Sequence, residues 1–208
     1  MLPNLTDIKF IRLMKKINSR HDPIFIPVVT ECYAVVSECF PNVERKIKRD
    51  GGSIIYGWQV WSTNLICEAE FHAVWKSIDG ELVDITPKNP PVDNILFVQD
   101  DSIVYKGAQI DNIRINKTDN PLVNDFIDIQ KALFKIRNKG VRAFSNEYTL
   151  SKNEALIYSK LESFSMDLCS YIYRGGKTNT HCFCESGETY ENCHRQELDS
   201  LIWLSKTI

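Results

Sequence analysis

The feature that most constrains this chain lies in its last quarter, where residues 181–194 read HCFCESGETYENCH. Cys182 and Cys184 are separated by one residue, so a tight turn can direct both thiolates to the same side. Cys193 and His194 follow after a short loop and begin a predicted helix. Three thiolates and one imidazole form a tetrahedral site with no open position, which is the structural type of zinc site. The sequence therefore predicts structural zinc as the cofactor, bound by these four residues.

Energetics favour the metal over the alternative, which is a set of buried or redox-active thiols. Ordering a segment of about 15 residues costs roughly 20 kcal/mol, and so short a segment has little apolar surface to offset that cost. Structural zinc contributes on the order of 10–16 kcal/mol, enough to decide whether the segment folds. A second histidine, His181, competes with His194 as the fourth ligand.

The same run resembles the SEC-C motif, a zinc-binding tail of the bacterial preprotein translocase ATPase that also occurs on many unrelated proteins. The resemblance covers residues 181–195, and the shared positions are Cys182, Cys184, Ser186, Gly187, Tyr190, Cys193 and His194. The family uses the histidine directly after the last cysteine, which implies His194 as the ligand, and such tails bind other proteins, which implies a protein partner. Arg195 replaces a common glycine and Glu188 a usual basic residue, changes expected to affect surface charge rather than ligation.

Composition and charge further restrict the classes of binding partner that we expect. The chain has 208 residues, of which 43% are hydrophobic and 25% charged, as in ordinary globular proteins. The formal net charge is −2, and the basic run at 45–49 is flanked by acidic residues, so we expect a solvated helix face there. Glu185, Glu188 and Glu191 also argue against nucleic-acid binding by the zinc module. The sequence gives no indication of an oligomeric state.

The sequence predicts a cytoplasmic protein with no membrane association. It shows no signal peptide at the N-terminus and no apolar run of the roughly 20 residues that a membrane-spanning helix needs. In that compartment an odd number of cysteines, here seven, indicates metal binding or catalysis rather than a disulfide framework.

Hydrophobic periodicity predicts an α+β fold, with helices, an antiparallel sheet, a helical connector and a small C-terminal zinc module. Expected helices are 5–18, capped near Asn4 or Thr6, then 31–49, interrupted at Pro41 and ended by Gly51-Gly52, then 121–138 and 151–173. Expected strands are 53–61, 66–75, 81–85 and 95–98, with a hairpin turn at Asp79-Gly80. The predicted domains are an α+β domain at 1–112, the connector at 113–176 and the zinc module at 177–208.

Three residues of the first domain have the types and order of a cysteine nucleophile, its base and the residue that orients the base. Cys39 lies near a helix N-terminus if Pro41 restarts the helix, and such a position stabilises the attacking thiolate. His72 and Asp84 lie on neighbouring predicted strands, where a carboxylate can fix the tautomer of an imidazole. They lie at unequal distances from the Asp79-Gly80 turn, so their contact requires a longer loop or a bulge.

This order resembles the transglutaminase-like and papain-like cysteine hydrolases. In that superfamily the nucleophilic cysteine opens a helix, and a His-x-x-Trp strand precedes an Asp-x-Thr-Pro strand. The matching positions over residues 30–100 are Cys39, His72, Trp75, Asp84, Thr86 and Pro87. The resemblance implies an acyl-enzyme on Cys39, with His72 acting as base and then as acid. The stretch from Cys39 to Trp58 also resembles the sequences of uncharacterised bacterial and phage proteins that carry the same tail.

The sequence leaves alternatives open for the nucleophile, for the role of Glu70 and for the function of the chain. The glycine-rich and tryptophan-rich context usual before such a nucleophile is missing, and Cys32 is a rival to Cys39. Glu70 shares a strand face with His72, and it either lines the same cleft or belongs to a surface pair. If His72 is only a core histidine, the chain is a non-catalytic adaptor that binds protein through its zinc tail. The acyl acceptor, water or an amine, is not specified, so peptidase, deamidase and transglutaminase activities are all candidates.

Overall fold

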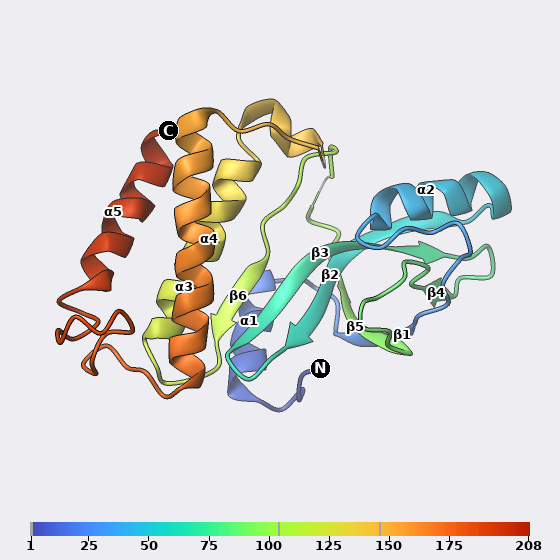
Figure 1. Cartoon of the computed structure of the whole chain (residues 1–208). Helices are drawn as coiled ribbons and strands as arrows, with labels where there is room; N and C mark the ends of the chain where they lie inside the picture. The colour runs from blue at the N-terminus through green and yellow to red at the C-terminus, as the bar shows by residue number, and fades with distance from the viewer. Residues whose placement is uncertain (1, 104, 146) are drawn as a thin grey trace. The chain divides into compact units, whose positions relative to one another are not determined.

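The computed structural model describes residues 2–103, 105–145 and 147–208, and the chain divides into two compact units (Figure 1). The first unit comprises Met1–Lys106 and Asn112–Ile115. The second comprises Gly107–Asp111 and Asn116–Ile208. Most of the segment predicted as a helical connector, and all of the segment predicted as a zinc module, therefore lie in one unit.

An antiparallel sheet forms the centre of the first unit. Its strands, over the described residues, are β1 (Ile24–Pro27), β2 (Ser53–Ser62), β3 (Ile66–Lys76), β4 (Leu82–Val83), β5 (Asn94–Gln99) and β6 (Ile113–Asn116). The order across the sheet is β1-β5-β2-β3-β4, and β6 also pairs with β3. The two longest strands, β2 and β3, pair along their whole length, with Ser53 opposite Lys76 and Ser62 opposite Cys67. Helices and this sheet together confirm the mixed architecture that the periodicity predicted.

Side chains on the sheet alternate between two apolar clusters. One cluster consists of Ile26, Val74, Ile95 and Phe97. The other consists of Cys39, Val43, Ala73 and Ile85. Because Cys39 and Val43 belong to α2 (Cys39–Asp50) and Ala73 to β3, the second cluster packs this helix against the strand. Burial of these side chains therefore fixes the N-terminal turn of α2 beside β3.

Both helices of the first unit begin later than predicted. Helix α1 spans Ile8–Ile17 and is capped by Asp7, which accepts a hydrogen bond from the backbone of Lys9 at 2.8 Å; the cap is thus the residue directly after Thr6, near which it was predicted. Helix α2 begins at Cys39 itself, and residues 31–38 form turns. Pro41 lies in the first turn of α2, where its missing N–H is not needed by the helix.

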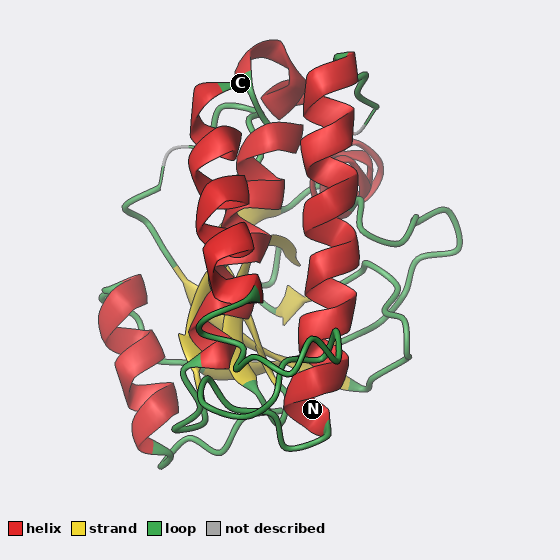
Figure 2. Ribbon diagram, turned by 60° about the vertical axis from the view of Figure 1, so that its left-hand side comes forward, coloured by secondary structure: helices red, strands yellow, loops and turns green. Residues whose placement is uncertain are grey.

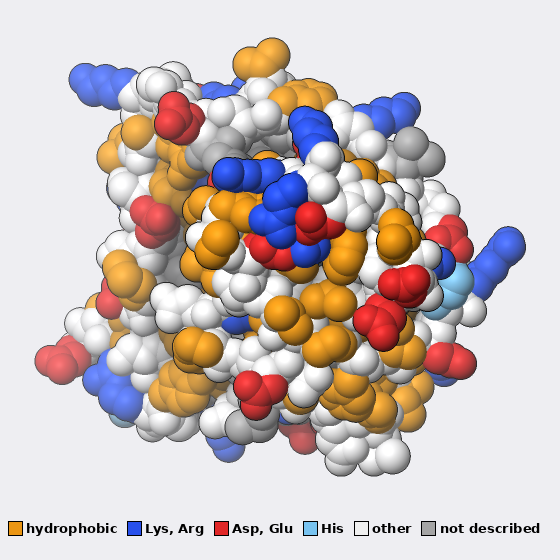
Figure 3. Space-filling model, turned by 90° about the vertical axis from the view of Figure 1, so that its right-hand side faces the viewer, with side chains coloured by type: hydrophobic (Ala, Val, Ile, Leu, Met, Phe, Trp, Pro, Cys, Tyr) orange, Lys and Arg blue, Asp and Glu red, His pale blue; other side chains and the backbone are white. Residues whose placement is uncertain are grey.

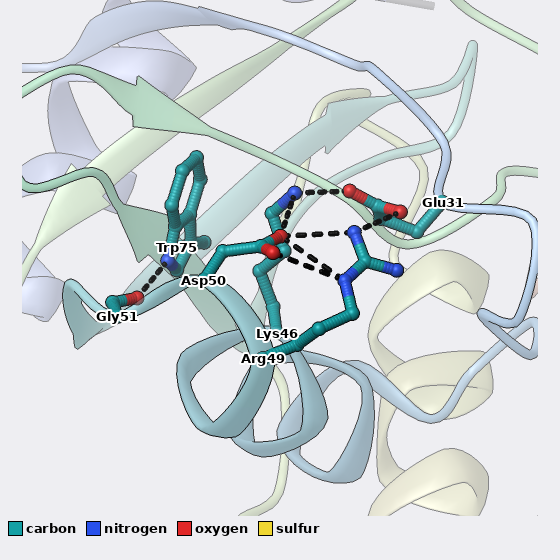
Figure 4. Close-up of polar contacts among 6 residues, drawn as sticks. All are labelled: Glu31, Lys46, Arg49, Asp50, Gly51 and Trp75. Atoms are coloured by element: carbon teal, nitrogen blue, oxygen red, sulfur yellow. Dashed lines mark hydrogen bonds and ion pairs between the residues drawn. The ribbon is translucent and has the colours of Figure 1, made fainter.

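An ion-pair network ties the segment before α2 to the helix (Figure 4). Lys46 contacts both Glu31 and Asp50, and its side chain is only 12% exposed. Arg49 reaches the same two carboxylates, at 3.0 Å for Glu31 and 2.9 Å for Asp50. The solvated helix face predicted for residues 45–49 is therefore partly wrong, because two of its basic residues anchor the 31–38 segment.

The side of the first unit that carries α2 mixes charged and apolar side chains. Figure 3 shows basic and acidic side chains in contact, surrounded by hydrophobic ones. Exposed hydrophobic residues in the segment before α2 include Val29, Val35 and Val36, with relative exposures of 61%, 58% and 48%. The turn segment thus presents apolar side chains to solvent although its backbone is anchored.

The second unit is a bundle of helices that run alongside one another (Figure 2). Its helices, over the described residues, are α3 (Leu122–Arg137), the short 3-10 helix η1 (Gly140–Phe144), α4 (Lys152–Tyr173) and α5 (His194–Thr207). Helix α4 begins with a capping box, in which Ser151 and Glu154 satisfy each other's backbone N–H groups. None of the helices in the described part of the chain is long and apolar enough to cross a bilayer.

Candidate functional site

A cluster of potential metal ligands lies immediately before and at the start of α5. The ligand atoms of Cys182, Cys184, Cys193 and His194 all lie within 4.8 Å of one another. The Sγ atom of Cys182 is 3.1 Å from Nδ1 of His194, and the Sγ atoms of Cys184 and Cys193 are 3.6 Å apart. This group could hold a metal ion. The competing His181 lies near the carbonyl oxygen of Gly187 and is not a member of the group.

Local hydrogen bonds shape the loop that carries these thiols. The backbone N–H of Cys182 donates to the carbonyl of Glu188 at 2.9 Å, which closes the turn. Gly187 has a φ of 86°, a left-handed conformation that glycine adopts without a steric penalty. Hydrogen bonds from Ser186 lower the pKa of the Cys184 thiol to about 6. Because metal ions bind thiolates, this shift favours metal binding at neutral pH.

A buried polar network anchors the loop to the helix bundle. Tyr190 is fully buried, and its hydroxyl donates to Oδ2 of Asp125 on α3 at 3.0 Å. Arg195 pairs with the other oxygen of Asp125 at 2.5 Å. Burial raises the pKa of Asp125 and outweighs the opposing effect of Arg195 and Tyr190. Arg195 was expected to change only surface charge. Instead, this residue shares the buried Asp125 of α3 with Tyr190 and so helps to anchor the loop at 177–193 that carries the cysteines, called the metal loop below.

Replacement of Arg195 by alanine is expected to loosen the metal loop, because Asp125 would remain buried without its cation. The Arg195 side chain is 42% exposed, so we expect a cost of only about 1–2 kcal/mol. That corresponds to roughly tenfold faster amide hydrogen exchange in residues 177–193, measured by mass spectrometry on metal-loaded protein. Asp199→Ala is the matched control, because its exposed pair with Arg195 on α5 is worth under about 0.5 kcal/mol. Equal protection in both variants would contradict the anchoring role.

A second group of residues comes together in the first unit. Cys39 begins α2, His72 lies on β3 and Asp84 follows directly after β4. All three are buried, with relative exposures of 7%, 3% and 0%. Nε2 of His72 is 3.0 Å from Oδ2 of Asp84, and the Cys39 thiol lies close enough to the imidazole to raise its pKa.

The contact between His72 and Asp84 is possible because β4 is only two residues long. Val83 pairs with Trp75, and the chain then leaves the sheet at Asp84. The backbone N–H of Asp84 donates to the carbonyl of Pro27 at 3.0 Å, outside the sheet ladder of β3. Its second carboxylate oxygen accepts the N–H of Thr86 at 2.9 Å. These bonds hold the carboxylate against the imidazole. Of the two alternatives that the sequence left, a longer loop or a bulge, the structure has the longer loop, over residues 77–81.

Electrostatics favour charged forms for both members of this pair. Burial lowers the pKa of His72, but the neighbouring Cys39 and Asp84 outweigh burial and raise the pKa to about 9. Burial likewise raises the pKa of Asp84, but His72 and Lys88 outweigh it and lower the value below its usual range. The imidazolium and the carboxylate are therefore both stable at neutral pH.

A cavity of about 140 Å³ opens onto Cys39 and His72. Its wall includes Cys39, His72, Glu70 and Trp61. Glu70 thus lines the same cleft as His72, the first of the two alternatives for this residue, and Trp61 belongs to the cleft wall. The rival nucleophile Cys32 lies exposed in a turn and is not among the described residues that line the cavity.

Two residues of the cavity were not singled out from the sequence. Lys88 donates to Oδ2 of Asp84 at 2.6 Å and to Oε1 of Gln59 at 2.9 Å, and its Nζ is 3.3 Å from Nε2 of His72. Gln59 is only 1% exposed and lies on β2 opposite Glu70. A glutamine between the apolar residues of a buried strand is a signal that could have identified it. Lys88 has no comparable local signal, because its role depends on tertiary contacts.

The turn before α2 has a constrained geometry. Asn42 accepts the N–H of Val35 at 3.0 Å and donates to its carbonyl at 2.8 Å, and it also donates to the hydroxyl of Thr86 at 3.2 Å. Ser37, which lines the cavity next to the helix, has a φ of 65°. This left-handed conformation is uncommon for a residue other than glycine and is typical of functional sites. Asn42 therefore links the cysteine-bearing helix, the turn and the segment after Asp84.

Comparison of the chain with models of known protein families, with curated proteins and with solved structures found no match.

Proposed function

We propose that the first unit is a cysteine-dependent amide or ester hydrolase or acyl transferase, related to the transglutaminase-like and papain-like enzymes. The observation that carries this proposal is that Cys39 and His72, from two separate elements, line one cavity, and that the buried Asp84 contacts the imidazole of His72. A buried thiol beside an imidazole that is hydrogen-bonded to a carboxylate supplies the groups that nucleophilic acyl transfer requires.

In the proposed mechanism the Cys39 thiolate attacks the carbonyl carbon of the substrate, and the carbonyl π electrons move to oxygen. The tetrahedral species then collapses, and the C–N or C–O bond breaks as His72 donates its proton to the leaving group. His72 next removes a proton from water or an amine, which attacks the thioester and releases Cys39. Asp84 holds the imidazole in orientation and stabilises its cation throughout. The raised pKa of His72, about 9, supports an imidazolium as the resting acid.

The second unit has a different role in this proposal. Its cysteine–histidine cluster holds zinc as a structural ion, in the manner of a SEC-C module, and the folded module docks a protein partner. Three thiolates and one imidazole fit zinc in type and number, and they leave no ligand position for catalysis. The acidic Glu185 and Glu188, both exposed next to the cluster, favour a protein surface over nucleic acid as the partner.

Limited labelling of zinc-loaded protein with iodoacetamide at about pH 6.5, mapped by mass spectrometry, tests the proposed nucleophile. Cys39 is expected to react at least about tenfold faster than Cys32, because its thiolate is stabilised by His72 and by a helix N-terminus. Accessibility alone predicts the reverse order, since Cys32 is exposed and Cys39 is buried. His72→Ala is expected to remove the advantage of Cys39 and to leave the rate at Cys32 unchanged.

The pattern of labelling separates the hypotheses. Fast labelling of Cys32 that depends on His72 would transfer the nucleophile to that residue. Labelling that follows exposure alone and ignores His72 would overturn the enzyme proposal. In that case the chain would be a non-catalytic adaptor that binds protein through its metal module.

A further inference from the structure

We propose that the side-chain amide of Gln59 is the hydrogen-bond donor that stabilises the oxyanion formed during attack by Cys39. The proposal rests on the acyl-transfer function proposed above and assigns a further catalytic residue to that site. Gln59 lies on β2, which pairs with the strand that carries His72, and it lines the same cavity as Cys39.

The orientation of the Gln59 amide is fixed by Lys88. An ammonium group can only donate hydrogen bonds, so the atom of Gln59 that lies 2.9 Å from Nζ must be the oxygen, Oε1. Lys88 is itself held by its ion pair with the buried Asp84 at 2.6 Å. The NH2 group of Gln59 is therefore the end that Lys88 leaves available.

That NH2 group is buried without a partner. Gln59 is 1% exposed, and Nε2 has no hydrogen-bond partner within the described residues. A buried amide left without a hydrogen bond costs roughly 1–3 kcal/mol, so such groups are rare in folded proteins. A donor retained at this cost on the wall of a cavity indicates a ligand acceptor, and the cavity also holds the proposed nucleophile.

The chemistry of attack supplies such an acceptor. When the Cys39 sulfur bonds to the carbonyl carbon, the carbonyl oxygen takes up the π electrons and becomes negative. A preorganised N–H donor stabilises this oxygen more than the neutral carbonyl, which lowers the barrier. The contact with the Lys88 ammonium also draws electron density toward Oε1 and strengthens the N–H groups as donors. Gln59 would thus be linked through Lys88 to the carboxylate that orients His72.

The test compares two reactions of Cys39 in zinc-loaded full-length protein. Acylation by p-nitrophenyl acetate passes through an oxyanion, whereas alkylation by iodoacetamide displaces iodide and does not. Gln59→Glu and Gln59→Met both remove the donor, the first retaining the acceptor for Lys88 and the second adding no charge. We expect each to slow acylation by about 100-fold while alkylation changes by less than about threefold. Gln99→Met, at the end of β5 and not among the described residues that line the cavity, is the control and is expected to change neither rate.

The outcomes distinguish this inference from the function on which it rests. Wild-type protein that is alkylated at Cys39 but never acylated there would overturn both. Acylation at the wild-type rate in both Gln59 variants would overturn the role of Gln59 and leave the nucleophile intact. A parallel fall in both rates would show that Gln59 only maintains the structure, and would likewise overturn its catalytic role.

Discussion

Cys193→Ser protein is expected to lose the metal ion proposed for the cysteine–histidine cluster and the folded structure of residues 177–193. Cys193 supplies one of four ligand atoms that lie within 4.8 Å of one another, and it directly precedes another of the four residues, His194. Structural zinc contributes on the order of 10–16 kcal/mol to folding, far more than the buried side chains of so short a loop can replace. We expect metal content to fall from one equivalent to near zero, and hydrogen exchange in this segment to reach that of an unfolded chain.

A neighbouring histidine provides the matched control for the metal experiment. His181 lies next to Cys182 in the sequence but outside the ligand group, so His181→Ala is expected to retain one equivalent of metal. Treatment of wild-type protein with a strong chelator should reproduce the exchange pattern of Cys193→Ser. Retention of metal by Cys193→Ser, or its loss from His181→Ala, would show that the ligand set is wrong.

The second large effect is expected from Asp84→Ala, which should destabilise the first unit by about 3–5 kcal/mol. Asp84 is fully buried and contacts two cations, His72 at 3.0 Å and Lys88 at 2.6 Å. Removal of the carboxylate leaves both cations in a buried site without their counter-ion. Urea unfolding followed by tryptophan fluorescence measures the change, since Trp58, Trp61 and Trp75 all lie on β2 and β3.

A surface pair of the same chemistry serves as the control for Asp84. Asp101 lies 2.5 Å from His21, but its side chain is 68% exposed, so Asp101→Ala is expected to cost less than about 1 kcal/mol. The pH dependence gives an independent check. The folded pKa of Asp84 is lowered, so its contribution is present above the unfolded pKa and is lost as pH falls through the folded value. Asp84→Ala should lack that acidic loss, and equal costs for the two alanine variants would contradict the buried network.

Local patterns in the sequence predicted the elements that carry the site better than the boundaries of those elements. The alternation of apolar residues located β2 and β3 to within about one residue. The prediction of a helix over 31–49 was wrong at its start, because side-chain contacts of Asn42 and ion pairs of Glu31 hold residues 31–38 in turns. Such contacts join residues that are not neighbours in the sequence, so the local helix propensity of the segment cannot predict them.

The same limit applies to the candidate site. Residue types and order were enough to select Cys39, His72 and Asp84, and the structure brings these three together. Lys88 was missed because an isolated lysine has no distinctive spacing, and its contacts arise only when β2 and the segment after β4 meet. Gln59 interrupts a run of apolar residues, but no local pattern showed that it lines the cavity. Arg195 was misjudged for the same reason, since its partner Asp125 lies on another helix.

The backbone at Ser37 has an evolutionary consequence. A left-handed conformation costs a residue with a Cβ atom roughly 1–2 kcal/mol, and glycine would remove that penalty. Selection for stability alone would thus favour glycine at position 37, although glycine would make the turn at the cavity wall more flexible. Serine at position 37 therefore exchanges some stability for a stiffer turn at the cavity wall, the trade-off expected of a site that must hold its geometry.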